Sequence, residues 1–217
     1  TAFFRLEVEI SVAKIFIFTF DYYFNNSKIM SKPLLIILLG PVSSGKSTIG
    51  KKISKELSLP FINKDDLKEV IFNSSGWKDK KYSKKVGKEA YAILYYCINC
   101  ILSIFSSVIV EANFTSKLST KKIKDLLKKH NASLVQLNCW TKKGVLAERF
   151  KERNKLGIRH PGHCEDYIFK DIKDSLKKGR VDVLDIKGSI LEIETTDLDK
   201  IDYKSIIKKL KSKVDKV

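Results

Sequence analysis

Short runs of apolar residues alternate along the chain with segments in which apolar residues recur every three or four positions. The continuous runs predict buried strands over residues 33–39, 59–62, 107–111, 133–140 and 190–194. The periodic segments predict helices over 46–57, from 65 onward, over 89–105, around 121–129, over 146–153 and from the last strand through 211. Because parallel strands need crossover connections, this alternation predicts an α/β fold, a three-layer sandwich around a central five-stranded parallel sheet.

Two stretches lie outside this pattern. The basic, polar residues 73–88 are predicted to form an exposed excursion, and residues 157–163, which read GIRHPGH, have the Gly, Pro, Arg and His content of a mobile lid. In a parallel sheet, ligands bind at the carboxyl ends of the strands. We therefore expect the polar residues at or just past the predicted strand ends to converge on one rim: Gly40, Asp65, Asp66, Glu111 and Asn113.

The first strand leads into residues 40–48, which read GPVSSGKST, a complete phosphate-loop pattern of the form G-x-x-x-x-G-K-[ST]. Such a loop surrounds phosphate oxygens with backbone N–H groups, and the following helix directs its positive end at the same anion. The lysine would reach the β and γ phosphates, and the serine after it would be a ligand of Mg²⁺. The sequence thus predicts an ATP and Mg²⁺ site, with nucleotide-binding residues Gly40, Ser43, Ser44, Gly45, Lys46, Ser47 and Thr48.

Acidic residues at the predicted rim are the candidates for catalysis and metal binding. Asp65 and Asp66 open a helix, and one of them could simply cap its first turn. Phosphoryl transfer needs a carboxylate that orients and deprotonates the acceptor hydroxyl, and Asp65 is the candidate base. Glu111 ends an apolar strand and is the candidate to hold Mg²⁺ with Ser47; the alternative is an exposed acid at a strand end.

Arginines in the second half of the chain are candidates for binding phosphate. Arg149 and Arg153 lie four residues apart and so share a helix face, where they could stabilise charge on the transferred phosphoryl group. Ion pairs with Glu148 and Glu152 are the alternative. Together with Lys46 and Asp65, both arginines complete the predicted catalytic set. The predicted contacts to the acceptor are Asp66, Lys68, Asn113 and Arg159.

Composition changes this picture little. The 217 residues suit one α/β domain, and the formal charge of +17 comes largely from lysines spread along helices, so solvated helix faces explain it as well as a polyanion partner does. The phosphate loop implies an ATP-containing, reducing compartment, so we expect a cytoplasmic protein without disulfides. Cys97 and Cys100 have the spacing of a redox motif but are predicted to pack as buried thiols.

The N-terminal residues differ from the rest. Met30 is the only methionine and directly precedes the first strand, so we expect residues 1–29 to be an extension and residues 30–217 to be the ATP-binding domain. The apolar run 15–20 is too short to span a membrane, and the acids around it argue against a secretory signal. The sequence therefore predicts no membrane partner, and it leaves the oligomeric state open.

Five motifs in order, GPVSSGKST, NKDDLKEVIF, VIVEANF, RFKER and RHPGH, resemble the AAA-type P-loop kinase family, which includes zeta toxins, chloramphenicol phosphotransferase and the kinase domain of phage polynucleotide kinase. The likeness spans about residues 33–213 and implies a P-loop NTPase fold with a lid region. It also implies that Asp65 is the general base and that Arg149 and Arg153 are lid arginines. Polynucleotide kinases typically carry an arginine at the position of Lys68, and many relatives carry an aspartate at that of Glu111.

The leading hypothesis is an ATP- and Mg²⁺-dependent phosphotransferase that moves the γ phosphate to a hydroxyl of a small molecule. A kinase of polynucleotide 5′-hydroxyl ends is less favoured, because Lys68 lacks the two-pronged grip of arginine on a substrate phosphate. The aromatic residues in or after the basic stretch could stack on bases: Trp77, Tyr82, Tyr91, Tyr95 and Tyr96. The tyrosines have helical spacing and are expected instead to pack in the core or at its rim. A third alternative is an ATP-hydrolysing switch or RNA-associated adaptor.

Overall fold

The computed structural model describes residues 32–104 and 106–214, so the expected extension, residues 1–29, lies outside the described part. Five strands form one sheet in the order β2-β3-β1-β4-β5, and every neighbouring pair is parallel. This confirms the predicted fold class. The strands are β1 (Leu34–Leu39), β2 (Phe61–Asn63), β3 (Val108–Glu111), β4 (Ser133–Trp140) and β5 (Ser189–Glu194).

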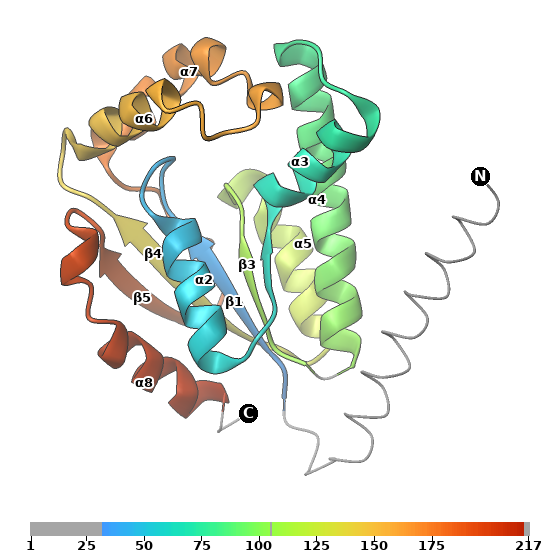
Figure 1. Cartoon of the computed structure of the whole chain (residues 1–217). Helices are drawn as coiled ribbons and strands as arrows, with labels where there is room; N and C mark the ends of the chain where they lie inside the picture. The colour runs from blue at the N-terminus through green and yellow to red at the C-terminus, as the bar shows by residue number, and fades with distance from the viewer. Residues whose placement is uncertain (1–31, 105, 215–217) are drawn as a thin grey trace. The chain divides into compact units, whose positions relative to one another are not determined.

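Helices cover both faces of the sheet (Figure 1). Alternate residues of β1 point to opposite faces, so Leu35 and Ile37 belong to one core cluster and Leu34 and Ile36 to the other. All six β1 residues are buried, as expected of a central strand with a layer on each side. The covering helices are α4 (Lys80–Ser103) and α5 (Ser116–Lys129) on the first face and α2 (Lys46–Leu57) and α8 (Tyr203–Val214) on the second.

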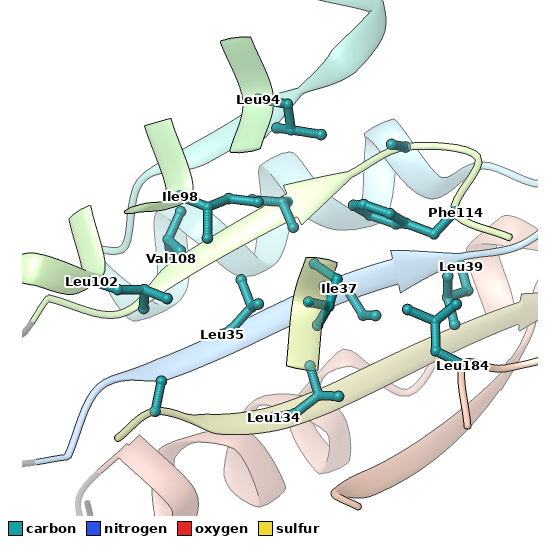
Figure 2. Packing of buried hydrophobic residues seen from close by; sticks show 14 residues of the cluster. Leu35, Ile37, Leu39, Leu94, Ile98, Leu102, Val108, Phe114, Leu134 and Leu184 are labelled. Atoms are coloured by element: carbon teal, nitrogen blue, oxygen red, sulfur yellow. The ribbon is translucent and has the colours of Figure 1, made fainter. Parts of the chain in front are cut away.

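The first core cluster shows how one long helix follows the sheet. Leu94, Ile98 and Leu102 of α4 lie four residues apart and pack toward β1 and β3 (Figure 2). Upstream of them, Ala90, Val86 and Ser83 continue the same buried row. This row is the face of α4 that packs against the rest of the protein.

The same row corrects the prediction for residues 73–88. The structure places no long excursion there: α3 (Lys64–Ser75) is followed by residues 76–79, and α4 already begins at Lys80, where the Asp79 side chain accepts a hydrogen bond from the Tyr82 N–H. The lysines between the buried positions hide the helical period, because the buried row needs only Ser83 and Val86 in this stretch. Cys97 and Cys100, which were predicted to be buried, are half-buried on α4.

Two further helices lie at the carboxyl ends of the strands. α6 (Val145–Lys155) and α7 (Glu165–Lys178), the second of which was not predicted, pack on each other through Leu146, Phe150 and Leu176, with Val42 of the phosphate loop against them. Residues 156–164 connect the two helices, and we call them the α6–α7 segment. They contain a short 3₁₀ helix, η1 (Pro161–His163), and a second 3₁₀ helix, η2 (Leu198–Lys200), precedes α8. Within residues 32–104 and 106–214, no helix has both the length and the apolar character that crossing a membrane requires.

Candidate active site

A cavity of about 640 Å³ lies between the phosphate loop, the first turns of α3 and α4, and the α6–α7 segment. Every residue that the sequence singled out for the site lines this cavity, except Gly40, which borders a neighbouring one. The convergence follows from the topology, because β1, β2 and β3 are adjacent and parallel and their carboxyl ends meet. Whether each residue has the predicted role depends on its local contacts.

The phosphate loop has the backbone that its glycines and serines imply. Gly40 has a φ of 147°, and a Cβ built there would lie 2.6 Å from the carbonyl oxygen of Cys139. Ser43 and Gly45 also have positive φ values, 64° and 82°. The hydroxyl oxygens of Ser43 and Ser44 are buried and have no hydrogen-bond partner among the described residues. Buried polar atoms normally have partners, so the loop fits an anionic ligand that would supply them.

Lys46 is buried within this loop, with 6% of its surface exposed. Its ammonium donates to the carbonyl oxygens of Gly40 and Pro41, at 3.0 and 2.7 Å. Burial lowers the pKa of Lys46, and the charge of Glu111 opposes that shift. The lysine is therefore held at the loop by backbone carbonyls, from which it can turn to phosphate oxygens.

Ser47 and Glu111 form a pair that suits a divalent cation. The Ser47 hydroxyl donates to Glu111 Oε1 over 3.1 Å, and Glu111 Oε2 is buried without a partner in the described part of the chain. Burial raises the pKa of Glu111, while Lys46 and the Ser47 hydroxyl act to lower it. Carboxylate and hydroxyl oxygens are the donors that Mg²⁺ accepts, so an oxygen-ligated cation fits here. The alternative of an exposed strand-end acid is wrong, because Glu111 is 7% exposed.

Asp65 does not cap α3. The cap is Asn63, whose side-chain oxygen accepts a hydrogen bond from the Asp65 N–H over 2.8 Å. The Asp65 carboxylate instead pairs with Lys64 and with Arg159 of the α6–α7 segment. Burial by itself would raise the pKa of Asp65, but Arg159 and Lys64 outweigh it and hold the pKa well below its usual range. Asp65 is thus a charged carboxylate at the cavity, partnered by cations.

The two arginines expected to act together have different partners. Arg149 donates to the carbonyl oxygens of Thr195 and Thr196, at 2.8 and 3.0 Å, and so ties α6 to the segment after β5. Arg153 pairs with Glu165 at the start of α7. Neither contact is the surface ion pair with Glu148 or Glu152 that the sequence left open.

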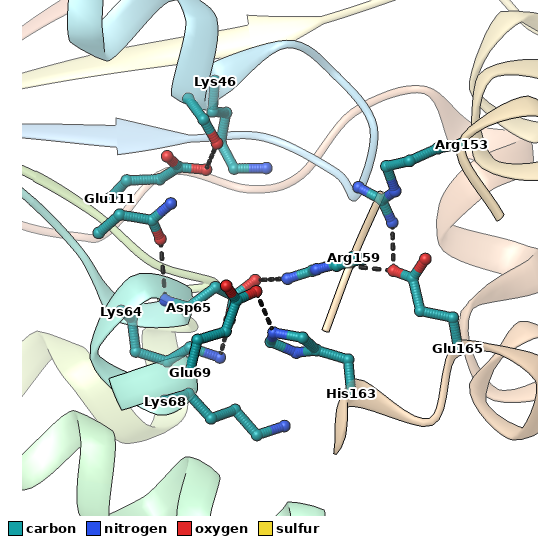
Figure 3. Close-up of polar contacts among 12 residues, drawn as sticks. Lys46, Lys64, Asp65, Lys68, Glu69, Glu111, Arg153, Arg159, His163 and Glu165 are labelled. Atoms are coloured by element: carbon teal, nitrogen blue, oxygen red, sulfur yellow. Dashed lines mark hydrogen bonds and ion pairs between the residues drawn. The ribbon is translucent and has the colours of Figure 1, made fainter. Parts of the chain in front are cut away.

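Glu165 is a site residue to which no pattern in the sequence pointed. Its Oε1 accepts from both Arg153 and Arg159, the second at 2.9 Å, and its side chain is 5% exposed. Figure 3 shows the Arg159 side chain between the carboxylates of Asp65 and Glu165. Arg159 therefore links the α6–α7 segment to α3 across the cavity.

The predicted acceptor contacts lie on the α3 side. Asp66 is exposed, and so is Asn113, whose carbonyl oxygen accepts a 2.7 Å hydrogen bond from the Tyr91 hydroxyl. Lys68 is buried and donates to the Ser83 hydroxyl of α4 over 2.8 Å. Tyr91 packs against the core as expected, whereas Trp77 and Tyr96 are exposed.

Sequence reasoning also missed how the η1 segment is held on α3. His163 Nε2 lies 2.8 Å from Glu69 Oε1, and the Phe72 ring stacks on His160 with the ring centroids 5.2 Å apart. A Cβ on Gly162 would come within 2.7 Å of the Phe72 ring, so glycine permits this close approach. The segment that carries Arg159 is thus packed on α3.

The η1 contact predicts a pH dependence of stability. Burial, followed by the nearby Arg159 charge, lowers the pKa of His163 to about 3, so the neutral ring donates to Glu69. The unfolded histidine binds a proton below about pH 6.5 and the folded one does not, so stability falls as the pH drops from about 6.5 toward 3. The other charged groups that act on this ring are Asp65, Lys68 and Lys64.

The free energy of unfolding, measured by urea titration at pH 7 and pH 5, tests this. We expect His163→Gln, which keeps a side-chain donor, to lose less stability between these pH values than the parent chain, by on the order of 1–2 kcal/mol. Equal losses in the two proteins would mean that His163 binds its proton in the folded state as readily as in the unfolded state.

Comparison with known proteins agrees with this fold and cavity. Residues 35–178 match a family model described as an AAA domain. Over 94 residues, 40% of this chain and 52% of the relative, the sequence is 34% identical to shikimate kinase of Francisella tularensis subsp. novicida (strain U112). The chain spans about half the length of the curated relatives it matches.

Solved structures extend the likeness to most of the chain. The crystal structure of a candidate kinase from Chloroflexus aurantiacus J-10-fl is 34% identical, with a TM-score of 0.79, and the match covers 84% of this chain and 98% of that one. A sugar kinase from Janibacter sp. HTCC2649 is 12% identical with a TM-score of 0.50, over 85% of this chain and 95% of that one, which is a likeness of fold. Because the family model matches more than half of the sequence, the chain belongs to the AAA-type P-loop kinase family.

Proposed function

We propose that this protein is an ATP- and Mg²⁺-dependent phosphotransferase that moves the γ phosphate of ATP to a hydroxyl group of a small molecule. The observation that carries the proposal is that one cavity joins the phosphate loop to a charged carboxylate, Asp65, and to the guanidinium groups of Arg153 and Arg159. A protein that only stored nucleotide would need the phosphate loop but no carboxylate across the cavity from it.

The part of the cavity that would bind ATP, the phosphoryl donor, is the phosphate loop with Lys46, Ser47 and Glu111. We call it the donor half of the cavity. Loop N–H groups and the Lys46 ammonium would hold the phosphates, and Ser47 with Glu111 would hold Mg²⁺. When bound, Mg²⁺ neutralises charge on phosphate oxygens. The hydroxyl oxygens of Ser43 and Ser44 and Oε2 of Glu111 are buried and have no hydrogen-bond partner within residues 32–104 and 106–214, which supports this assignment.

The acceptor half centres on Asp65. In the proposed step, the acceptor oxygen forms a bond to the γ phosphorus, the bond from that phosphorus to the β–γ bridging oxygen breaks, and ADP leaves. The hydroxyl proton passes to the Asp65 carboxylate, which also orients the hydroxyl. In a loose transition state the proton moves late, so even a weakly basic carboxylate suffices.

Arg153 and Arg159 are proposed to stabilise the charge on the transferred phosphoryl group. In the structure, both are held by Glu165, and Arg159 also pairs with Asp65. Phosphate oxygens in the cavity would compete for Arg159 and free the Asp65 carboxylate for the acceptor. Arg149, whose guanidinium binds backbone carbonyls, is better placed to hold α6 against the segment after β5.

The shikimate kinase that resembles this chain supports a small-molecule acceptor, since shikimate is the substrate in its name. The likeness covers about half of that protein, so it supports the class of acceptor and not its identity.

A transfer screen with γ-labelled ATP tests the proposal. The acceptors are hydroxylated metabolites, nucleosides and 5′-hydroxyl oligonucleotides, each run with the parent chain and with Asp65→Asn. We expect label in a small hydroxyl compound and its loss in the variant. Label in oligonucleotides would indicate a polynucleotide kinase, and hydrolysis that needs no acceptor and is unaffected by Asp65→Asn would indicate a switch.

A further inference from the structure

The proposed function does not say which chemical groups the acceptor carries besides its hydroxyl. The cavity wall built by α3 and α4 limits the possible classes of acceptor. We call this the acceptor wall and define it by Lys64, Lys68, Lys80, Ser83, Lys84 and Gly87, all of which line the cavity. Figure 3 shows Lys46 and Lys68 at opposite ends of the group of side chains, with Asp65 between them. A molecule whose hydroxyl reaches Asp65 would therefore have its other end near Lys68.

Lys68 is a buried cation, with 8% of its surface exposed. Its ammonium donates to the neutral Ser83 hydroxyl at 2.8 Å and lies 5.2 Å from the centre of the Phe72 ring. Burial, and then the charge of Lys64, lower the pKa of Lys68 to about 8. A buried ammonium is costly unless an anion compensates it, and a hydroxyl and a ring compensate it only in part.

Two acids of α3 that line the cavity are already engaged. Asp65 pairs with Lys64 and Arg159, and Glu69 accepts from His163. The Asp65 charge acts to raise the pKa of Lys68, but in the part of the chain that the structure describes neither carboxylate forms a hydrogen bond or ion pair with the Lys68 ammonium. Lys68 therefore has the environment of a residue whose counter-charge comes with a ligand.

Gly87 leaves room for such a ligand. It lies within α4, where glycine is less favourable than alanine by roughly 1 kcal/mol, and its backbone angle is that of an ordinary helix. Apart from the adjacent residues and backbone of α4 itself, the only described atom within 4 Å of a Cβ built there is Lys68 Cε, at 4.0 Å. The helix thus has open space directly beside the Lys68 side chain.

Charge at the mouth of the cavity favours the same kind of ligand. Lys80 and Lys84 line both this cavity and a second surface hollow. The other residues of that hollow are one acid, one tyrosine and four lysines: Asp79, Tyr82, Lys78, Lys81, Lys85 and Lys88. A surface with this excess of positive charge raises the local concentration of anions. An acceptor that carries an anion would be drawn toward the acceptor wall.

We propose that the acceptor carries a carboxylate or phosphate group in addition to its hydroxyl, and that Lys68 and Ser83 bind this group in the space beside Gly87. The inference rests on the proposed function, because it names the class of acceptor that the same cavity uses. Small hydroxy acids and sugar or nucleoside phosphates belong to this class. Neutral polyols and nucleosides do not.

Matched pairs of compounds test the proposal on the full chain. The pairs are glucitol and gluconate, glucose and glucose 6-phosphate, and uridine and uridine monophosphate, so the carboxylate and phosphate arms are separate. Transfer is measured with γ-labelled ATP. Binding is measured by calorimetry after Mg²⁺ and a non-hydrolysable ATP analogue have filled the phosphate loop, so that the probes do not bind there.

Two variants locate the site. Lys68→Met keeps the length of the side chain without its charge, and we expect it to weaken binding of the anionic member by about tenfold to a hundredfold while nucleotide affinity is retained. Gly87→Leu fills the space beside Lys68 and should block the anionic probe, which keeps the test decisive if Lys68→Met does not fold. The control is Lys121→Met, an exposed lysine of α5, which should change neither binding nor transfer.

The outcomes separate the two proposals. Anionic probes that bind through Lys68 without accepting phosphate would support the anion site and contradict the kinase activity. Transfer to the neutral member of a pair at equal or better efficiency, or transfer unaffected by both variants, would overturn the anion site and leave the kinase activity standing. Failure of every probe to bind at millimolar concentration would also overturn the anion site.

Discussion

An Asp65→Asn variant is expected to lose about 10²–10⁴-fold in kcat for γ-phosphate transfer, with a much smaller change in ATP affinity. The amide has nearly the shape of the carboxylate and can still accept hydrogen bonds from Lys64 and Arg159, but it cannot take the proton of the acceptor hydroxyl. Rates from labelled ATP at saturating acceptor, together with calorimetric ATP binding, give the two quantities.

The same variant has a stability signature that depends on pH. Because Lys64 and Arg159 hold the pKa of Asp65 below its usual range, the carboxylate contributes stability above about pH 4, and this contribution is lost as the pH falls further. Asp65→Asn should therefore be less stable than the parent at pH 7, and the difference should shrink in acid. Asp125→Asn, on the surface of α5, is the matched control. If Asp65→Asn kept full transfer activity, Asp65 would not be the base in the chemical step.

A Lys46→Met variant is expected to lose on the order of 10²–10³-fold in kcat and also to bind ATP more weakly. The lysine is buried at the phosphate loop, and methionine has a similar length but no charge to place on phosphate oxygens. Its removal also takes away the cation that opposes the raised pKa of Glu111. We therefore expect weaker Mg²⁺-dependent nucleotide binding as well.

Calorimetric titration of Mg²⁺-ATP and the transfer assay measure both effects. Lys55→Met, an exposed lysine in the last turn of the same helix, is the control and should behave as the parent does. If Lys46→Met bound Mg²⁺-ATP and transferred phosphate as the parent does, the loop would not be the donor site. Together with Asp65→Asn, this variant separates the donor half of the cavity from the acceptor half.

Local patterns in the sequence were enough to predict the sheet and the loop. A central strand buried on both faces must be apolar throughout, which makes β1 visible as a continuous run. The phosphate loop is visible because its backbone needs glycine at Gly40, where a side chain would strike the Cys139 carbonyl. Both features depend on residues close together in the chain.

The start of α4 was missed for the opposite reason. Its first turns are buried only through Ser83 and Val86, and the lysines between them face the solvent or the cavity. Burial of those two positions depends on how α3 and α4 pack, which a local pattern does not contain. The N-cap of α3 was also not predictable from a local pattern. The sequence suggested that one of the two aspartates caps the helix, but the capping side chain is that of Asn63.

By itself, the sequence determined the parallel α/β fold, the phosphate loop and the set of polar residues at the strand ends, because each follows from short-range periodicity, backbone geometry and strand direction. Only the tertiary structure decided which charges meet. Asp65 contacts Arg159, Glu165 gathers Arg153 and Arg159, and Lys68 of α3 reaches Ser83 of α4. These contacts join residues of different helices, and their strength depends on burial in a cavity that exists only after those helices have packed together.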